Sequence, residues 1–279
     1  MRLARCAYKM IDMQKSFDPK THEYLIDGKR ATGVTTIISV LNKPQLYGWY
    51  ARMAVERVAE MWEADKPYPK ELIAAILEEA KGAGNKKKEA AGTHGTDSHS
   101  LVESWINAQL TGSTSDTDYK PIQHFIDWAG ANVDHFLFSE RQMFNKDMFL
   151  AGTADFGCMM KDGKKLIGDW KTSSGVYGID YFLQCAGYKI LAEAEGDAPY
   201  DGCVIVRQGK KGADDFDVHY RYAETSTKEA STDLWNRLMG FIGAKQTEVI
   251  NYSDIDAKAF MACLTIYRAQ ATFKKPNYK

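Results

Sequence analysis

The sequence has no long apolar run, and its purely apolar stretches fall far short of the roughly 20 residues that span a bilayer. The opening MRLARCAYKM contains charged residues but no apolar core, so it does not resemble a secretory signal. Cysteine is scarce as well. The five cysteines are scattered and form no CxxC pair, which predicts neither a disulfide framework nor a zinc site. We therefore expect a cytoplasmic protein that has no membrane partner.

The chain also has no marked excess of charge of either sign. Its 36 lysines and arginines stand against 37 aspartates and glutamates, so the overall charge does not by itself indicate a nucleic-acid partner. Hydrophobic residues make up 44% and charged residues 26%, which excludes an extensively disordered or fibrous chain. The 279 residues predict one large domain or two small ones, with enough core to fold without a disulfide or metal.

Hydrophobic periodicity predicts both strands and helices. Alternation around Asp27-Gly28 predicts a β-hairpin within 22–35, and the spacing from residue 36 to about 110 is helical. A polar loop at 111–118 precedes another helical stretch that begins near Ile122. The later expected elements are strands at 136–144, 149–160, 165–171, 202–207 and 215–223, and helices at 179–195, 226–247 and 254–271.

This order of elements predicts an α/β (α+β) fold in which a central mixed β-sheet is flanked by helices, with an N-terminal hairpin and helical block. No internal repeat or low-complexity tract interrupts it. We expect residues 1–130 to form the hairpin and helical region and residues 131–279 to form the sheet core with its C-terminal helices. The two regions would make one compact unit.

The segment GTADFGCMMKDGKKLIGDWKTS carries the clearest chemical signal. A three-residue loop at 161–163, with its glycine in the left-handed conformation, would set the register of a hairpin. Asp155 then lies opposite Asp169, and alternation puts Lys171 on the same face. Two adjacent carboxylates repel each other, which a hard divalent cation such as Mg²⁺ relieves. A two-residue turn at 162–163 would instead split the carboxylates between faces, and an exposed hairpin with surface ion pairs is the alternative interpretation.

Two further residue pairs have the spacing of one helical turn. His99 and Glu103 lie four residues apart, on one face of a helix for which Ser98 is the expected N-cap. Gln184 and Tyr188 have the same spacing on the helix that follows the hairpin. Each pair alone is compatible with an ordinary solvated helix face.

In this order the residues resemble the motifs of the PD-(D/E)XK nucleases, in particular the RecB-like branch. That branch carries GxxxHxxxE on a helix, an acidic residue on a strand, GxxD, DxK and QxxxY. The matching residues, within about 92–207, are Gly95, His99, Glu103, Glu140, Gly152, Asp155, Asp169, Lys171, Gln184 and Tyr188. Ala154 stands where the family's name has proline. The opening, with Asp27-Gly28, VTTIISVLNKP and Trp49, resembles phage exonucleases and the mitochondrial genome maintenance exonuclease.

The resemblance implies a PD-(D/E)XK nuclease core in residues 131–279 and a metal-dependent site. His99, Asp155, Asp169 and the backbone carbonyl of Trp170 would bind Mg²⁺ or Mn²⁺. Lys171 would orient the attacking water and stabilise the transition state. The other implied roles are positioning of the phosphate or the lysine by Gln184 and Tyr188, and outer support or a second metal site from Glu103 and Glu140. The cysteine spacing of relatives that bind an iron–sulfur cluster is absent, so neither that cluster nor zinc is expected.

DNA contacts are expected from residues on either side of these motifs. The candidates for the phosphate backbone are Lys86, Lys87 and Lys88, upstream of the histidine motif, and Thr172 and Ser173, after the DxK strand. The lysine run is alternatively a solvated helix face. Trp49 and Tyr50 would either stack on unpaired bases or be buried in the helical block.

The function implied by the resemblance is a divalent-metal-dependent DNA exonuclease that hydrolyses phosphodiester bonds. It would act on single-stranded DNA ends in phage or bacterial replication, recombination or repair. A separate recombinase, single-strand-binding protein or helicase would be its partner, in the host cytoplasm if the chain is phage-encoded. The alternatives are a lambda-type duplex-DNA exonuclease, a structure-specific endonuclease, a catalytically silent DNA-binding scaffold, and an unrelated metalloprotein that uses His94 and His99.

Overall fold

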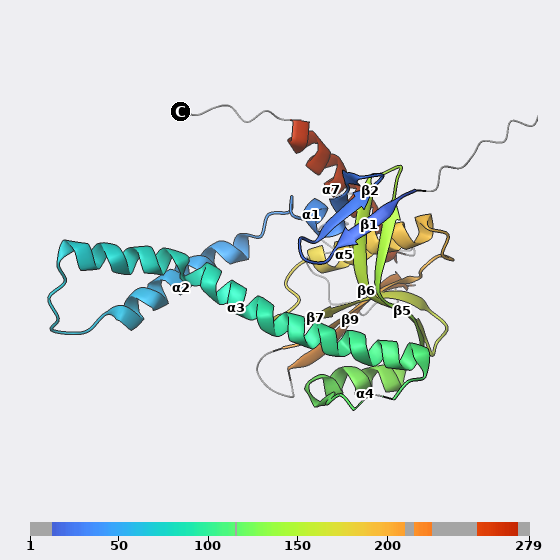
Figure 1. Cartoon of the computed structure of the whole chain (residues 1–279), viewed down its shortest axis with the longest axis horizontal. Helices are drawn as coiled ribbons and strands as arrows, with labels where there is room; N and C mark the ends of the chain where they lie inside the picture. The colour runs from blue at the N-terminus through green and yellow to red at the C-terminus, as the bar shows by residue number, and fades with distance from the viewer. Residues whose placement is uncertain (1–12, 115, 210–214, 225–249, 273–279) are drawn as a thin grey trace, which may run out of the picture.

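A mixed seven-stranded sheet forms the centre of the structure, and helices cover both of its faces (Figure 1). The computed structural model describes residues 13–114, 116–209, 215–224 and 250–272. The strand order is β10-β9-β8-β7-β6-β4, and β5 also pairs with β6. The strands are β4 (Thr32–Gly33), β5 (Val133–Asn145), β6 (Leu150–Met160), β7 (Lys165–Lys171), β8 (Gly202–Gln208), β9 (Phe216–Glu224) and β10 (Ile250–Asn251). The predicted fold class, a central mixed sheet flanked by helices, is confirmed.

Two strands share one edge of β6. β7 pairs antiparallel with residues 156–159 of β6, and β4 pairs parallel with residues 150 and 151. β5 pairs with β6 from residue 150 to residue 160 and so occupies the other edge. β7 and β4 therefore leave residues 152–155 of β6 between them, and this opening contains the GxxD segment of the sequence.

A second, three-stranded antiparallel sheet precedes the central one. It comprises β1 (Lys15–Asp18), β2 (Glu23–Ile26) and β3 (Lys29–Arg30). Asp27 and Gly28 have φ of +49° and +74°, the backbone that a two-residue hairpin turn requires. The predicted hairpin is therefore confirmed. Residues 34 and 35 belong instead to the first helix, and the sequence did not predict β1.

The helical block is divided into separate helices rather than forming one continuous stretch. The helices are α1 (Val34–Ile38), α2 (Pro44–Met61), α3 (Lys70–Thr111), the 3₁₀ helix η1 (Lys120–Ile122), α4 (Gln123–Asn132), α5 (Asp180–Ala194) and α7 (Tyr252–Thr272). Ser98 is not an N-cap, because α3 runs for 42 residues and Ser98 lies inside it.

The helix expected at 226–247 lies outside the described residues. No helix in the described ranges is both long and apolar enough to cross a membrane.

Helices α2 and α3 form a hairpin that extends away from the sheet (Figure 1). The first half of α3 packs on α2, and its second half crosses to the region of α4 and β5. At 1.5 Å per residue, α3 is roughly 60 Å long, which accounts for its reach from the projecting tip to the sheet. The residues of the histidine motif lie in the half that reaches the sheet.

Strand alternation divides the hydrophobic core between the two faces of the sheet. On β7, Ile167 packs in the cluster formed with α1, α5 and α7, whereas Leu166 and Trp170 pack in the cluster formed with α3 and α4. Asp169 and Lys171 have the same parity as Ile167, so they project toward α5. The same alternation that fills the core thus directs the DxK side chains to the helix that carries Gln184.

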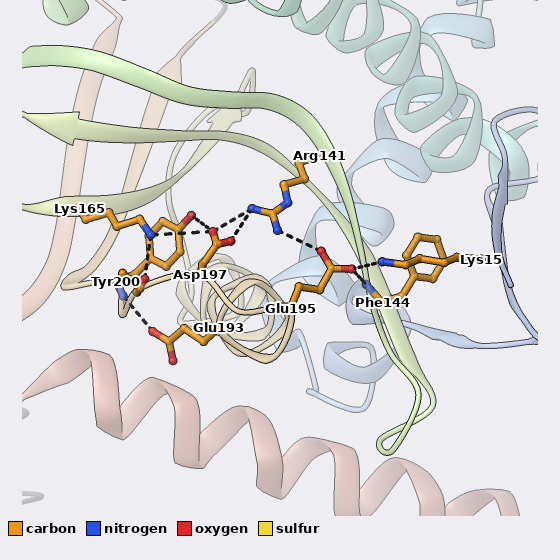
Figure 2. Close-up of polar contacts among 9 residues, drawn as sticks. Lys15, Arg141, Phe144, Lys165, Glu193, Glu195, Asp197 and Tyr200 are labelled. Carbon is orange, nitrogen blue, oxygen red and sulfur yellow. Dashed lines mark hydrogen bonds and ion pairs between the residues drawn. The ribbon is translucent and has the colours of Figure 1, made fainter. Parts of the chain in front are cut away.

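A polar network joins β5 to the C-terminal end of α5 and to β1 (Figure 2). Arg141 donates hydrogen bonds to both carboxylate oxygens of Asp197, at 3.0 and 2.8 Å, and to Glu195 Oε2 at 3.1 Å. Glu195 Oε1 accepts from Lys15 Nζ at 2.8 Å and from the amide of Phe144 at 3.0 Å. The network therefore ties the N-terminal sheet to the central one through α5.

Loss of the Arg141 guanidinium is expected to destabilise the protein. The Arg141→Gln variant leaves two mostly buried carboxylates with fewer donors, at a cost of about 2–3 kcal/mol in the free energy of unfolding. Urea denaturation measures this cost. The control is Arg57→Gln, since Arg57 pairs with Glu60 and Glu79 on an exposed surface, where solvent screens the pairs and they contribute little to stability. Equal losses in the two variants would contradict the role given to the network.

Candidate metal centre

The loop between β6 and β7 sets the register on which the site depends. Gly163 has φ of +86°, and the amide of Met160 donates to the carbonyl of Lys164 at 2.8 Å, which closes the three-residue loop. The pairs then run from Met159–Lys165 to Phe156–Gly168, as predicted. One step further along the same register places Asp155 across from Asp169.

β6 and β7 separate at this step, and a side-chain hydrogen bond takes the place of the backbone hydrogen bonds between the two strands. Asp155 Oδ2 accepts a hydrogen bond of 2.7 Å from the backbone amide of Trp170. A buried amide without a partner is costly, so this contact holds β7 beside the opening in the sheet and fixes the orientation of the Asp155 carboxylate.

Asp169 is fully buried at the centre of a hydrogen-bonded group. Its Oδ1 accepts from Lys171 Nζ at 2.8 Å and from Gln184 Nε2 at 3.1 Å. Gln184 Nε2 also donates to the hydroxyl of Tyr188 at 2.9 Å. A Cβ on Gly152 would lie 2.7 Å from the Tyr188 ring, so only glycine allows β6 this close to α5. The GxxD, DxK and QxxxY residues are therefore packed into one unit.

Glu140 joins this unit from the far side of β6. Its neighbours pair as Ser139–Phe156 and Arg141–Ala154, so the position between them places Glu140 across from Asp155. Three carboxylates, on β5, β6 and β7, thus stand side by side. Glu140 has φ of +44°, a strained backbone for a residue other than glycine, and such strain is concentrated at functional sites.

His99 reaches the same point from α3. Its Nδ1 lies 3.6 Å from Asp155 Oδ2, and ligand atoms of His99, Glu140 and Asp155 all lie within 4.8 Å of one another. These residues come from three elements that are distant in sequence. Their convergence gives one nitrogen and several oxygens around a common point, a donor set that suits a divalent cation.

The charges in the site shift the pKa values of its members. Burial, with the nearby charges of Asp155, Glu103 and Asp169, raises the pKa of Glu140 to about 8. Burial raises the pKa of Asp155, and burial with the Asp155 charge raises that of Asp169 to about 6. Burial also lowers the pKa of His99, which keeps its imidazole neutral at pH 7 and available as a ligand.

Lys171 differs from these groups because its surroundings favour its charged form. Burial acts to lower its pKa, but the charges of Asp169 and Asp155 outweigh burial and raise the pKa above its ordinary value. Its Nζ also lies 2.7 Å from Asp169 Oδ2. One ammonium group faces three carboxyl groups here, so the cluster is short of positive charge once all three are ionised.

A second observation, the buried oxygen Oδ2 of Asp169, also suits a divalent cation. Asp169 Oδ2 is inaccessible to solvent, and its ion pair with Lys171 Nζ at 2.7 Å lacks hydrogen-bond geometry within the described part of the chain. A buried carboxylate oxygen that accepts no well-aligned hydrogen bond is costly, and a metal ion would satisfy it. His99, Glu140, Asp155 and Asp169 are therefore the residues that would hold Mg²⁺ or Mn²⁺.

Some predicted site residues do not belong to the group formed by His99, Glu140 and Asp155. Glu103 lines the cleft described below, and its charge contributes to the raised pKa of Glu140. Trp170 buries its ring and donates from Nε1 to Ser98 Oγ at 2.9 Å, while the metal-ligand role of its carbonyl stays a prediction. Thr172 is half-buried, and the Ser173 hydroxyl donates to the carbonyl of Gly175 at 2.9 Å.

The lysine run and the first aromatic pair lie on the projecting helices. Lys86 pairs with Glu79 at 2.8 Å and Lys87 approaches Glu56 at 4.0 Å, while Lys88 is exposed; α3 separates Lys88 from His99 by roughly 16 Å. The rings of Trp49 and Tyr50 are half-buried against Gly84 of α3. The side chain of His94, from the alternative metalloprotein hypothesis, lies outside the described residues.

A cleft of about 1080 Å³ opens beside the candidate metal centre. It is lined by His99, Glu103, Glu140, Asp155 and Tyr188, and on its other side by residues of the N-terminal sheet, including Phe17, His22, Tyr24 and Arg30. Sequence reasoning missed this second wall. The alternating apolar positions of residues 22–26 indicated a strand there, but nothing in the sequence indicated which element it would face.

No protein-family model matches the chain, and no curated protein matches it.

The candidate metal centre is expected to bind Mn²⁺ through Asp155. The Asp155→Asn variant removes a charged ligand, so its affinity for Mn²⁺ should fall by about tenfold or more in a calorimetric titration. Asp134→Asn is the matched control, because Asp134 also lies beside a histidine, His135, but on an exposed surface. Unchanged affinity in Asp155→Asn would exclude this centre as the binding site.

The raised pKa of Glu140 predicts that the metal-free protein loses stability as pH rises. Folded Glu140 keeps its proton up to about pH 8, whereas an unfolded glutamate loses it near 4.5, so stability falls across this window. In EDTA we expect a lower urea midpoint at pH 9 than at pH 6, and a smaller difference in Glu140→Gln. The exposed Glu63→Gln is the control. The same pH difference in both variants would rule out Glu140 as its source.

Proposed function

We propose that the chain is a divalent-metal-dependent deoxyribonuclease of the PD-(D/E)XK kind, an exonuclease acting on single-stranded DNA ends in replication, recombination or repair. The observation that carries the proposal is the group formed by Asp155, Asp169 and Lys171 at the opening of the sheet. Phosphodiester hydrolysis needs a metal-activated water and fixed positive charge near the scissile phosphate, and this group provides ligands for the first and a lysine for the second.

A bound Mg²⁺ or Mn²⁺ would lower the pKa of a coordinated water and offset charge on the phosphate. The side chains of the site orient the groups that would hold the metal. Asp155 and Asp169 hold their carboxylates in fixed orientations, the first through the Trp170 amide and the second through Gln184. A preorganised site does not have to reorient its dipoles as charge develops, which lowers the barrier.

Lys171 is suited to stabilise the transition state. Its ammonium group is anchored by both oxygens of Asp169, and its raised pKa keeps it charged across the physiological range. It would orient the attacking water and face the charge that develops on the phosphate. Gln184 acts as a positioning residue through its hydrogen bond to Asp169, and Tyr188 accepts a hydrogen bond from Gln184 and also lines the cleft.

The duplex exonuclease, the structure-specific endonuclease and the silent scaffold are outcomes of the same experiment. Purified protein is incubated with end-labelled DNA, single-stranded and duplex, linear and circular, in Mg²⁺, Mn²⁺ or EDTA. Metal-dependent shortening of linear single strands that spares circles supports the proposal. Cleaved circles indicate an endonuclease, preferred shortening of duplex ends indicates the lambda-type enzyme, and DNA binding without any cleavage indicates the scaffold.

The Lys171→Ala variant is expected to lose activity while remaining folded. Removal of one fixed charge at a developing oxyanion costs about 10²–10³ in turnover. The control is Lys161→Ala, since Lys161 lies in the loop of the same hairpin and its Nζ donates to the carbonyl of Gly130, away from the cleft. Initial rates of nucleotide release measure the effect. Equal activity in the two variants would remove Lys171 from the mechanism.

A further inference from the structure

Three aromatic rings form a continuous stack along the wall of the cleft. Phe17 of β1 lies beside its cross-strand partner Tyr24, with ring centroids 4.7 Å apart and planes inclined by 28°. The His22 ring also stacks on Phe17, with ring centroids 5.6 Å apart and planes inclined by 22°. All three residues line the same cleft as the candidate metal ligands.

The inner end of the stack is fixed to the strand that carries Asp155. The hydroxyl of Tyr24 shares a hydrogen bond of 2.9 Å with Thr153 Oγ1, two residues before Asp155 on β6. Burial raises the pKa of Tyr24, in keeping with its position against the central sheet. The stack therefore begins at the metal centre and ends at His22, whose side chain is exposed.

Core packing of the N-terminal sheet explains the positions of Phe17 and Tyr24 but not that of the His22 ring. Phe17 and Tyr24 contact the small core cluster of Ile26 and Phe144, whereas His22 is exposed. His22 has φ of +53°, an uncommon backbone for a residue other than glycine, in the turn between β1 and β2. An exposed ring held in this conformation, nearly parallel to the next ring, extends the stack without adding to the core.

We infer that this stack, the His22–Phe17–Tyr24 wall, is a binding subsite for the unpaired bases of a nucleic-acid strand whose phosphate lies at the metal centre. The inference rests on the proposed function and specifies its substrate. Unpaired bases stack on aromatic faces irrespective of sequence, whereas the bases of a duplex are already stacked on one another. Arg30 lines the same cleft with a largely exposed side chain, and it would approach the backbone of the bound strand.

The test separates base stacking from phosphate binding. In the Lys171→Ala background with Mn²⁺, fluorescence anisotropy measures the binding of a labelled single-stranded oligonucleotide and of the same strand with abasic sites. Both probes carry the same phosphates. His22→Ala should weaken binding of the intact strand about tenfold, equivalent to about 1.4 kcal/mol, and leave binding of the abasic strand unchanged.

Two further variants control for structure. His22→Phe keeps an aromatic face and should retain the affinity, while Tyr47→Ala removes an exposed ring on α2 that does not line the cleft and should have no effect. Thermal denaturation of each variant excludes loss of folding as the cause. Equal weakening of the intact and abasic strands by His22→Ala would overturn the inference, as would duplex binding as tight as single-strand binding.

The inference and the proposed function can fail separately. Base-dependent binding lost in His22→Ala, together with no cleavage by the unmodified protein in any metal, would support the subsite and overturn the nuclease. Metal-dependent cleavage with the same rate and affinity in His22→Ala would support the nuclease and overturn the subsite. Absence of any binding to the oligonucleotide, with Mn²⁺ binding intact, would overturn both and indicate a different occupant of the cleft.

Discussion

The hydrogen bond from the Trp170 amide to the Asp155 carboxylate lies where the central sheet divides, and the candidate site depends on it. β6 can accommodate β7 and β4 along one edge only if the two leave a gap between them, and a gap in a sheet exposes amides that must find other partners. Asp155 satisfies one of these amides with its side chain. The same contact turns its carboxylate toward Asp169, so a requirement of backbone pairing places two acidic groups together.

The acidic groups then determine the electrostatics of the site. Glu140, Asp155 and Asp169 stand on adjacent strands around one lysine, an arrangement that folding alone would not favour because like charges in a buried place repel. In the absence of a cation, protonation of Glu140 relieves part of the repulsion. A site of this kind gives up stability in its empty form, which is a common cost of groups arranged for catalysis or metal binding.

Some of this arrangement could be predicted from the sequence, and the reason is local. Loop length fixes hairpin register, and the sequence allowed either a three-residue loop at 161–163 or a two-residue turn at 162–163; the structure has the three-residue loop, which places Asp155 across from Asp169. Glu140 could be assigned only by resemblance, because its position depends on a left-handed residue within a strand. The contact of Tyr24 with Thr153 spans 129 residues and leaves no periodic signal. Ser98 was predicted as an N-cap, yet α3 continues past it, and its hydroxyl instead meets the Trp170 indole.

The polar network around Arg141 gives the strained residue a physical support. Glu140 precedes Arg141 directly, and its left-handed backbone costs about 1–3 kcal/mol. Asp197 and Glu195 hold the guanidinium of Arg141, which anchors the strand directly beside Glu140. Glu195 also binds Lys15 of β1, the strand that contributes Phe17 to the cleft. One network therefore connects the strand that carries Glu140 with the strand that forms the opposite wall of the cleft.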